Sequence, residues 1–199
     1  LVAERHNLRV AAIGISDEGE LDLNQARSLI NDDTALVAIT HVSNGLGVVN
    51  DVKAICRMAR EHGALCLVDG AQSALHFPIN VEDIDCDFFV FSGHKLFGPT
   101  GIGVLWGRIE LLEKMTPWQG GGEMIEKVSI TSSTYQQPPF KFEAGTPNIA
   151  GAVGLGAALK YLEQIDRDSL GKAQDSLVKN TTERLADMPG IKLIGNPNK

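Results

Sequence analysis

A carboxylate and an amine follow two successive apolar runs of this sequence. Asp69 closes the run 64–68, and Lys95 stands just past the run 88–91. If both runs are strands of one sheet, their ends bring the two side chains to the same edge. Pyridoxal phosphate (PLP) needs such a pair, because a lysine forms its Schiff base and an acid protonates its pyridine nitrogen. The pair therefore indicates PLP chemistry.

Three further side chains next to the pair suit the other polar groups of PLP. Gln72 follows Asp69 by three residues, and its amide can donate to the phenolic oxygen of the ring. Ser92 and His94 flank Gly93, where a hydroxyl, an imidazole and exposed backbone N–H groups can converge on a phosphate. Each also has a structural alternative, as a turn residue or a local backbone partner. We predict cofactor contacts for all three.

For two other positions, the structural alternative to a functional role is stronger. Asn44 follows another apolar run and precedes a glycine, so an ordinary Asn-Gly turn and a role near the substrate both stay open. Lys95 alone would be an ordinary surface lysine. The small-residue loop 96–101 that follows it lets a ligand approach closely, which favours the functional interpretation.

The composition argues against several classes of function. The formal net charge is -7 over 199 residues and no Lys/Arg cluster offsets it, so a nucleic-acid surface is not expected. The apolar helical stretch 147–159 stops at Lys160, short of the roughly 20 residues that span a membrane. The cysteines number three and lack CxxC spacing, which indicates buried, reduced thiols in a cytoplasmic protein. The histidines show no metal-binding spacing, so no metal site is predicted.

The apolar pattern predicts an α/β fold. Near-continuous apolar runs are typical of strands that are covered on both faces, as in parallel sheets. Ten residues separate Phe91 from Ile102, too few for a parallel crossover, so the last strand should be antiparallel to its neighbour. The pattern predicts a doubly wound α/β domain, with a mostly parallel sheet, one antiparallel strand and helices on both faces. The expected strands are 8–13, 35–40, 64–68, 88–91 and 102–106, and the expected helices are 21–30 and 51–62.

The second half of the chain changes character. Residues 116–145 are rich in glycine, proline, serine and threonine, which favours loops and a hairpin. Pro147 is expected at the first position of a helix with a core stripe of Ala152, Leu155, Leu159 and Leu162. A polar helix should follow over 166–186, and a strand over 191–194. We place a domain boundary near Gly171.

These residues and their surroundings resemble a known family. The sequence is similar to the class V aminotransferase-like branch of fold-type I PLP enzymes, and within it to the SUF-type (group II) cysteine desulfurases and selenocysteine lyases. The likeness covers nearly the whole chain, and the block around Lys95 and the triple-glycine block together make it specific. The stretches that carry it are 40–44, 68–72, 91–103, 120–125 and 142–148.

The resemblance implies a fold-type I PLP-dependent transferase fold, with a PLP-binding large domain over residues 1–170 that lacks its N-terminal part and the truncated start of a small C-terminal domain over 171–199. It also implies a role for each candidate residue. Lys95 would carry the Schiff base and move the Cα proton of the substrate, and Asp69 would pair with the pyridinium nitrogen. The family's active sites are shared across a homodimer. The other implied cofactor contacts are Gln72, Ser92, His94 and Asn44 and, for the phosphate in the other subunit, Gly145 and Thr146.

The resemblance also implies a reaction, and it implies that some of the residues needed for that reaction lie outside this sequence. Such enzymes convert L-cysteine to L-alanine, form an enzyme persulfide and hand its sulfur to an acceptor protein for iron–sulfur cluster assembly. We expect the glycine-rich phosphate loop and a ring-stacking histidine before Leu1, and the nucleophilic cysteine and a carboxylate-binding arginine after Lys199. Little or no desulfurase turnover is therefore expected from these residues alone. Cys56, Cys66 and Cys86 do not match the family's nucleophile.

Two alternatives remain. The same residues would serve another class V enzyme, such as a selenocysteine lyase, an aminotransferase or an epimerase. A non-catalytic α/β scaffold would keep the motif without binding the cofactor, and the intact set of Lys95, Asp69 and Gln72 argues against it.

Overall fold

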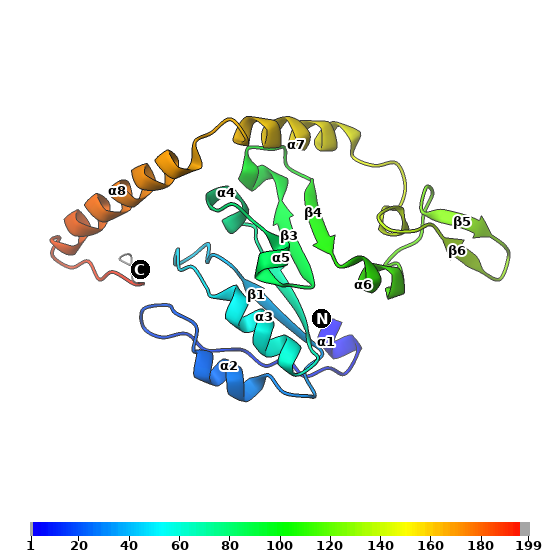
Figure 1. Cartoon of the computed structure of the whole chain (residues 1–199), viewed down its shortest axis with the longest axis horizontal. Coiled ribbons are helices and arrows are strands. Elements are labelled where there is room, and N and C mark those ends of the chain that lie inside the picture. The colour runs from blue at the N-terminus through cyan, green and yellow to red at the C-terminus, as the bar shows by residue number, and fades with distance from the viewer. Residues whose placement is uncertain (1, 196–199) are drawn as a thin grey trace. The chain divides into compact units, whose positions relative to one another are not determined.

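The structure is a computed structural model that describes residues 2–195. The chain divides into two compact units (Figure 1). One unit comprises Leu1–Cys86 and Ile165–Lys199, and the other comprises Asp87–Gln164.

The first unit is built on a parallel strand pair. β1 (Leu36–Thr40) and β2 (Leu65–Asp69) pair in register from Leu36 opposite Leu65 to Thr40 opposite Asp69. Helix α3 (Val52–Glu61) packs against both strands (Figure 1). The other helices of this unit are α1 (Val2–Arg5), α2 (Leu23–Leu29), α4 (Ser73–His76), α5 (Val81–Ile84) and α8 (Arg167–Ala186).

Helix α3 shows why the first unit could be predicted from the sequence. The Asp51 carboxylate caps the helix by accepting a 3.0 Å hydrogen bond from the Ala54 amide. The predicted apolar face is buried against the strands, and Ile55 and Ala59 are fully inaccessible. The remaining members of that face are Val52 and Cys56. All three cysteines are buried, as predicted.

The second unit is built on an antiparallel pair. β3 (Phe88–Ser92) runs into the short 3₁₀ helix η1 (Gly93–Leu96) and returns as β4 (Gly103–Gly107), with Phe88 opposite Gly107 and Ser92 opposite Gly103. This pairing confirms the direction predicted from the short connection. The predicted loops and hairpin follow: α6 (Ile109–Lys114), β5 (Ile125–Val128) paired antiparallel with β6 (Ser133–Tyr135), η2 (Phe140–Phe142) and α7 (Ile149–Leu162) (Figure 1).

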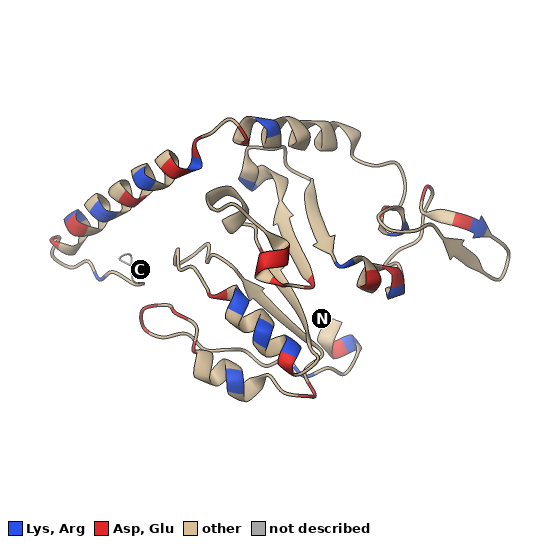
Figure 2. Cartoon of the chain, in the orientation of Figure 1, with Lys and Arg blue, Asp and Glu red and all other residues tan. Residues whose placement is uncertain are grey.

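The fold class is as predicted, a mixed α/β fold with a mainly parallel sheet and one antiparallel pair. Helix α8 carries bases and acids interspersed along its length and has no buried residue (Figure 2). It runs unbroken through Gly171, so the division into domains 1–170 and 171–199 stays a prediction. Among the described residues, no helix combines the length and apolarity that crossing a membrane requires.

Two predicted strands are wrong. Residues 8–13 and 191–194 form no strand. Their apolar side chains are largely in solvent, with Val10 77% and Ile194 69% exposed. An apolar run becomes a strand only where another strand supplies its hydrogen bonds, and neither segment pairs with one.

The start of α7 also differs from the prediction. Pro147 is not the first helical residue, because the helix begins two residues later, at Ile149. The Asn148 side chain caps it by accepting from the Gly151 amide at 2.9 Å. The predicted core stripe is half right. Leu155 and Leu162 are buried, whereas Ala152 and Leu159 are exposed. Gly151 and Ala158 are buried in their place, so the buried face is rotated by one residue.

Candidate cofactor site

Strand β2 ends at the acid that the sequence singled out. The half-buried Asp69 carboxylate accepts a hydrogen bond from the Ala71 amide through Oδ1, at 2.9 Å. The Asp69 carbonyl accepts from the His41 amide, also at 2.9 Å. Within residues 2–195, the second carboxylate oxygen, Oδ2, has no hydrogen-bond partner. One oxygen is thus fixed by the chain, and the other remains able to accept from a ligand.

The structure brings Gln72 and Asn44 together. Gln72 precedes the buried first residue of α4, and its Nε2 donates to Asn44 Oδ1. Asn44 lies in the turn enclosed by the β-bridge between Val42 and Val49. An amide nitrogen carries two hydrogens, so Gln72 keeps a second donor for a ligand. Both residues belong to the unit that carries Asp69.

A histidine that the sequence analysis did not single out lies beside this strand end. His41 follows β1 directly, and its ring stacks on Phe77 with the centroids 5.9 Å apart. Its Nδ1 is buried without a hydrogen-bond partner in the described part of the chain. Burial lowers the pKa of His41 below its ordinary value of 6.5, so the ring is neutral at neutral pH. Its position at a strand end next to Asn44 was the available signal.

The lysine lies in the second unit, on a tight turn after β3. Lys95 is part of η1, where its neighbour Leu96 is 3% exposed and anchors the turn. Two backbone hydrogen bonds close the turn, from the Gly93 amide to the Ile102 carbonyl at 2.8 Å and from the Gly98 amide to the Gly93 carbonyl at 3.0 Å. The half-buried Lys95 side chain has no hydrogen-bond or ion-pair partner among the residues described.

Two glycines allow this turn to pack closely. A Cβ on Gly98 would lie 2.8 Å from the Gly93 carbonyl oxygen and 3.2 Å from Leu155 Cδ1 of α7. A Cβ on Gly93 would lie 3.0 Å from the Ile102 carbonyl oxygen. Since real Cβ atoms do not approach backbone oxygen that closely, only glycine fits at Gly98 without a shift. The lysine is therefore presented on a backbone that β4 and α7 hold in place.

The structure also brings the two predicted phosphate ligands together. Ser92 Oγ and His94 Nδ1 share a hydrogen bond of 2.8 Å. The imidazole is exposed and the hydroxyl is half-buried. An imidazole has a second ring nitrogen and a hydroxyl has further lone pairs, so both groups keep capacity for an anion. Ser92, His94 and Lys95 thus form one polar end of β3.

Gly145 and Thr146 lie on a separate part of the second unit. The Gly145 amide donates to the Gly122 carbonyl at 2.9 Å, which ties this segment to the triple-glycine run. Thr146 is exposed, and its hydroxyl bonds to nothing within residues 2–195. The structure therefore does not join these two residues to Ser92, His94 or Lys95 by hydrogen bonds within the chain.

The residues fit PLP better than a metal ion. Asp69 Oδ2, the Lys95 amine and the second Gln72 donor are all unused by the described chain. Taken one by one, a carboxylate suits the pyridinium nitrogen of PLP, an amide donor suits its phenolic oxygen, and an amine suits its aldehyde carbon. Asp69 and Gln72 belong to the first unit and Lys95 belongs to the second. In the same described range, no group of three or more His, Cys, Asp or Glu side chains is arranged to hold a metal ion.

Comparisons with known proteins identify the family of the chain. The family description "Aminotransferase class-V" matches residues 1–199. The chain belongs to the aminotransferase class-V family. Membership implies PLP as the cofactor, and it confirms the resemblance inferred from the motifs.

The relatives narrow the comparison further. A cysteine desulfurase from Pectobacterium atrosepticum is 46% identical over 196 residues, which are 98% of this chain and 48% of that protein. The crystal structure of the cysteine desulfurase CsdA from Escherichia coli matches 95% of this chain and 47% of its own, with a TM-score of 0.91 and 42% identity. The apo cysteine desulfurase from Thermococcus onnurineus matches 99% of this chain and 49% of its own, with a TM-score of 0.92 and 42% identity. The chain therefore spans about half the length of the relatives that it matches.

Proposed function

We propose that this chain supplies the PLP-binding part of a cysteine desulfurase, which converts L-cysteine to L-alanine and retains the sulfur as an enzyme persulfide. One observation carries the proposal: Lys95, which has no partner among residues 2–195, lies on a glycine-dependent turn directly after β3. The identity to cysteine desulfurases extends over nearly the whole chain, which supports cysteine as the substrate.

Each candidate residue has its own role in the proposed function. Asp69 Oδ2 would accept a hydrogen bond from the protonated pyridine nitrogen and so keep that nitrogen protonated, while the hydrogen bond from the Ala71 amide keeps the carboxylate from rotating. One amide hydrogen of Gln72 is bonded to Asn44, and Gln72 donates the other to the phenolic oxygen. Bound PLP withdraws electrons from the Cα of an attached amino acid, which weakens its Cα–H bond. The Lys95 Nζ then accepts that proton and returns it when alanine forms.

The proposal also assigns residues to the phosphate of PLP, both within this chain and across a homodimer. Ser92 and His94 bind the phosphate together, since their mutual hydrogen bond holds both at the end of β3. Gly145 and Thr146 reach the phosphate of the other subunit in a homodimer, which accounts for an exposed Thr146 without a partner in the described part of its own chain.

The sulfur-transfer steps require residues other than the cysteines of this chain. Cys56 and Cys66 are each 1% exposed and Cys86 is inaccessible, so none can reach the sulfur of a substrate. We place the nucleophilic cysteine elsewhere in the complete protein. An acceptor protein then takes the sulfur from the persulfide, for iron–sulfur cluster assembly.

The test combines PLP binding with turnover. In absorbance titrations of this chain, Lys95→Ala should abolish the band of lysine-bound PLP, and Lys160→Ala, an exposed lysine on α7, should leave it unchanged. In the complete protein, Lys95→Ala should abolish alanine release from L-cysteine. Wild-type alanine release by Lys95→Ala would contradict the proposal, as would an equal loss of the band in both variants.

A further inference from the structure

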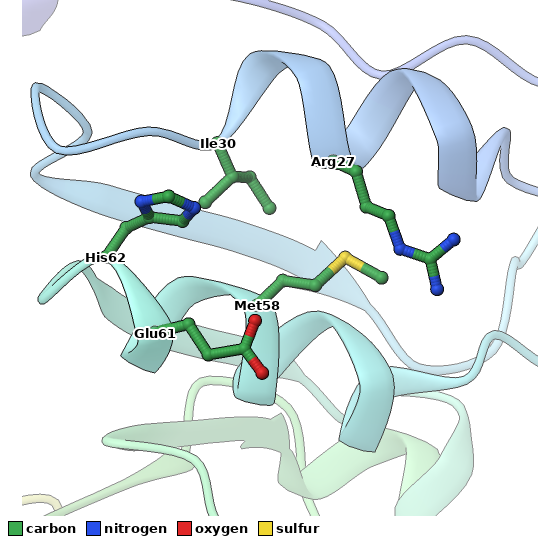
Figure 3. Close-up of a pocket in the computed structure, with 5 residues that line it drawn as sticks. All are labelled: Arg27, Ile30, Met58, Glu61 and His62. Carbon is green, nitrogen blue, oxygen red and sulfur yellow. The ribbon is translucent and has the colours of Figure 1, made fainter.

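A pocket of about 240 Å³ in the first unit is lined by none of the candidate-site residues (Figure 3). It is formed by helix α2 and the C-terminal end of α3. Its volume is smaller than the roughly 300–1,000 Å³ typical of pockets for drug-sized ligands, so a small molecule is the natural occupant. The residues that line it are Arg27, Ile30, Met58, Glu61 and His62.

The floor of the pocket is apolar. Ile30 is 4% exposed and Met58 is 6% exposed, so both are almost fully packed against the body of the unit. An unbranched thioether adapts its shape to whatever lies on it. A small aliphatic side chain resting on the small exposed part of these two residues would lose part of its contact with water, which favours binding.

The rim carries unpaired charges of opposite sign. Arg27 on α2 and Glu61 on α3 are both exposed, and Figure 3 shows the Met58 side chain between them. Neither has an ion-pair or hydrogen-bond partner among residues 2–195. The neighbouring cation on α3, Arg60, is by contrast paired with Asp85 at 2.9 Å. The pocket thus offers a guanidinium to an anion and a carboxylate to a cation.

His62 adds a second group for a cation. Its Nδ1 lies 2.7 Å from Asp32 Oδ1. An ionised carboxylate only accepts hydrogen bonds, so Nδ1 must donate, and in the neutral ring Nε2 is then an acceptor. Glu61 and His62 also end the ten-residue helix α3, where the helix dipole favours positive charge. Three features at one end of the pocket therefore favour an ammonium group.

We propose that this pocket binds a small zwitterion, namely a free α-amino acid with an aliphatic side chain. The carboxylate of the ligand pairs with Arg27, and its ammonium group pairs with Glu61 and with Nε2 of His62. Its side chain rests on Ile30 and Met58. PLP takes no part in this site, so the proposal stands or falls independently of the proposed function.

The experiment follows the Met58 methyl resonance in methyl-¹³C-methionine-labelled protein, assigned with Met58→Leu. The probes are L-leucine, leucinamide, which lacks the carboxylate, and N-acetyl-leucine, which lacks the ammonium group. L-leucine should shift the resonance saturably. Each analogue should bind more weakly by about two- to fivefold, as expected for one exposed charge pair.

Variants separate the two charges. Arg27→Gln should weaken binding of L-leucine but not of leucinamide, and Glu61→Gln should weaken binding of L-leucine but not of N-acetyl-leucine. Arg57→Gln, an exposed arginine of α3 outside the pocket, is the matched control and should change nothing. Absence of a saturable shift would overturn the proposal. Equal binding of all three probes, unaffected by either variant, would overturn it too, because it would show apolar adsorption alone.

Discussion

Replacement of Gly98 by alanine should strain the turn that presents Lys95. The new Cβ would lie 2.8 Å from the Gly93 carbonyl oxygen, which is backbone and cannot swing away, and 3.2 Å from Leu155 Cδ1. Ordinary contacts begin near 3.4 Å, so the overlap must be relieved by moving η1 or α7. Overpacking of this kind costs about 1–3 kcal/mol. We expect Gly98→Ala to lower the free energy of unfolding by that amount.

Gly156→Ala is the matched control. Gly156 lies inside α7, and a Cβ there meets nothing within 4 Å. Alanine in a helix interior is favoured over glycine by about 0.8–1 kcal/mol, so this variant should be more stable than the wild type. Urea denaturation followed by circular dichroism measures both variants. A Gly98→Ala variant as stable as Gly156→Ala would refute the close packing of the Lys95 turn.

Three further predictions concern the first unit. Asp69→Asn keeps an oxygen for the Ala71 amide but loses the negative charge. PLP affinity measured by absorbance should therefore fall about 10- to 100-fold, as for the loss of a charge-assisted hydrogen bond of ~1.5–3 kcal/mol. Unchanged affinity would exclude Asp69 as the pyridinium partner. Burial lowers the pKa of His41 in the folded chain below 6.5. As the pH falls, the His41 imidazole is therefore protonated first in the unfolded chain. The free energy of unfolding should decrease as the pH drops from about 6.5 through the pKa of the folded state. In urea titrations at several pH values, His41→Phe should show a smaller fall over this window, and a fall equal to that of the wild type would contradict the assignment. Asp51→Ala removes the cap on the Ala54 amide and should cost about 1 kcal/mol of unfolding free energy; Asp51→Asn, which keeps a capping oxygen, should restore most of it.

The elements that could be predicted are those whose signals are local. Helix α3 has a capping aspartate and an apolar face at helical spacing, and β2 and β3 are short apolar runs with polar ends. The segment 8–13 has the same apolar character but no strand beside it. A strand depends on its partner, and the composition of one segment does not report whether a partner exists.

The features that could not be predicted from the sequence depend on tertiary contacts. Counting apolar residues misplaced the buried face of α7, because Gly151 is buried and carries no hydrophobic signal. His41 lies at a strand end next to Asn44, but only the structure shows that its Nδ1 is buried without a hydrogen-bond partner in the described part of the chain. Lys95 was identified from the chain, whereas the need for glycine at Gly98 follows from the position of the Gly93 carbonyl.

The most direct test of the cofactor site is chemical trapping. PLP is added to the chain, the mixture is reduced with borohydride, and the pyridoxyl group is mapped by mass spectrometry. The account predicts a single adduct on Lys95, weakened in Asp69→Ala. Labelling scattered over exposed lysines such as Lys114 and Lys160, or no labelling at all, would contradict it.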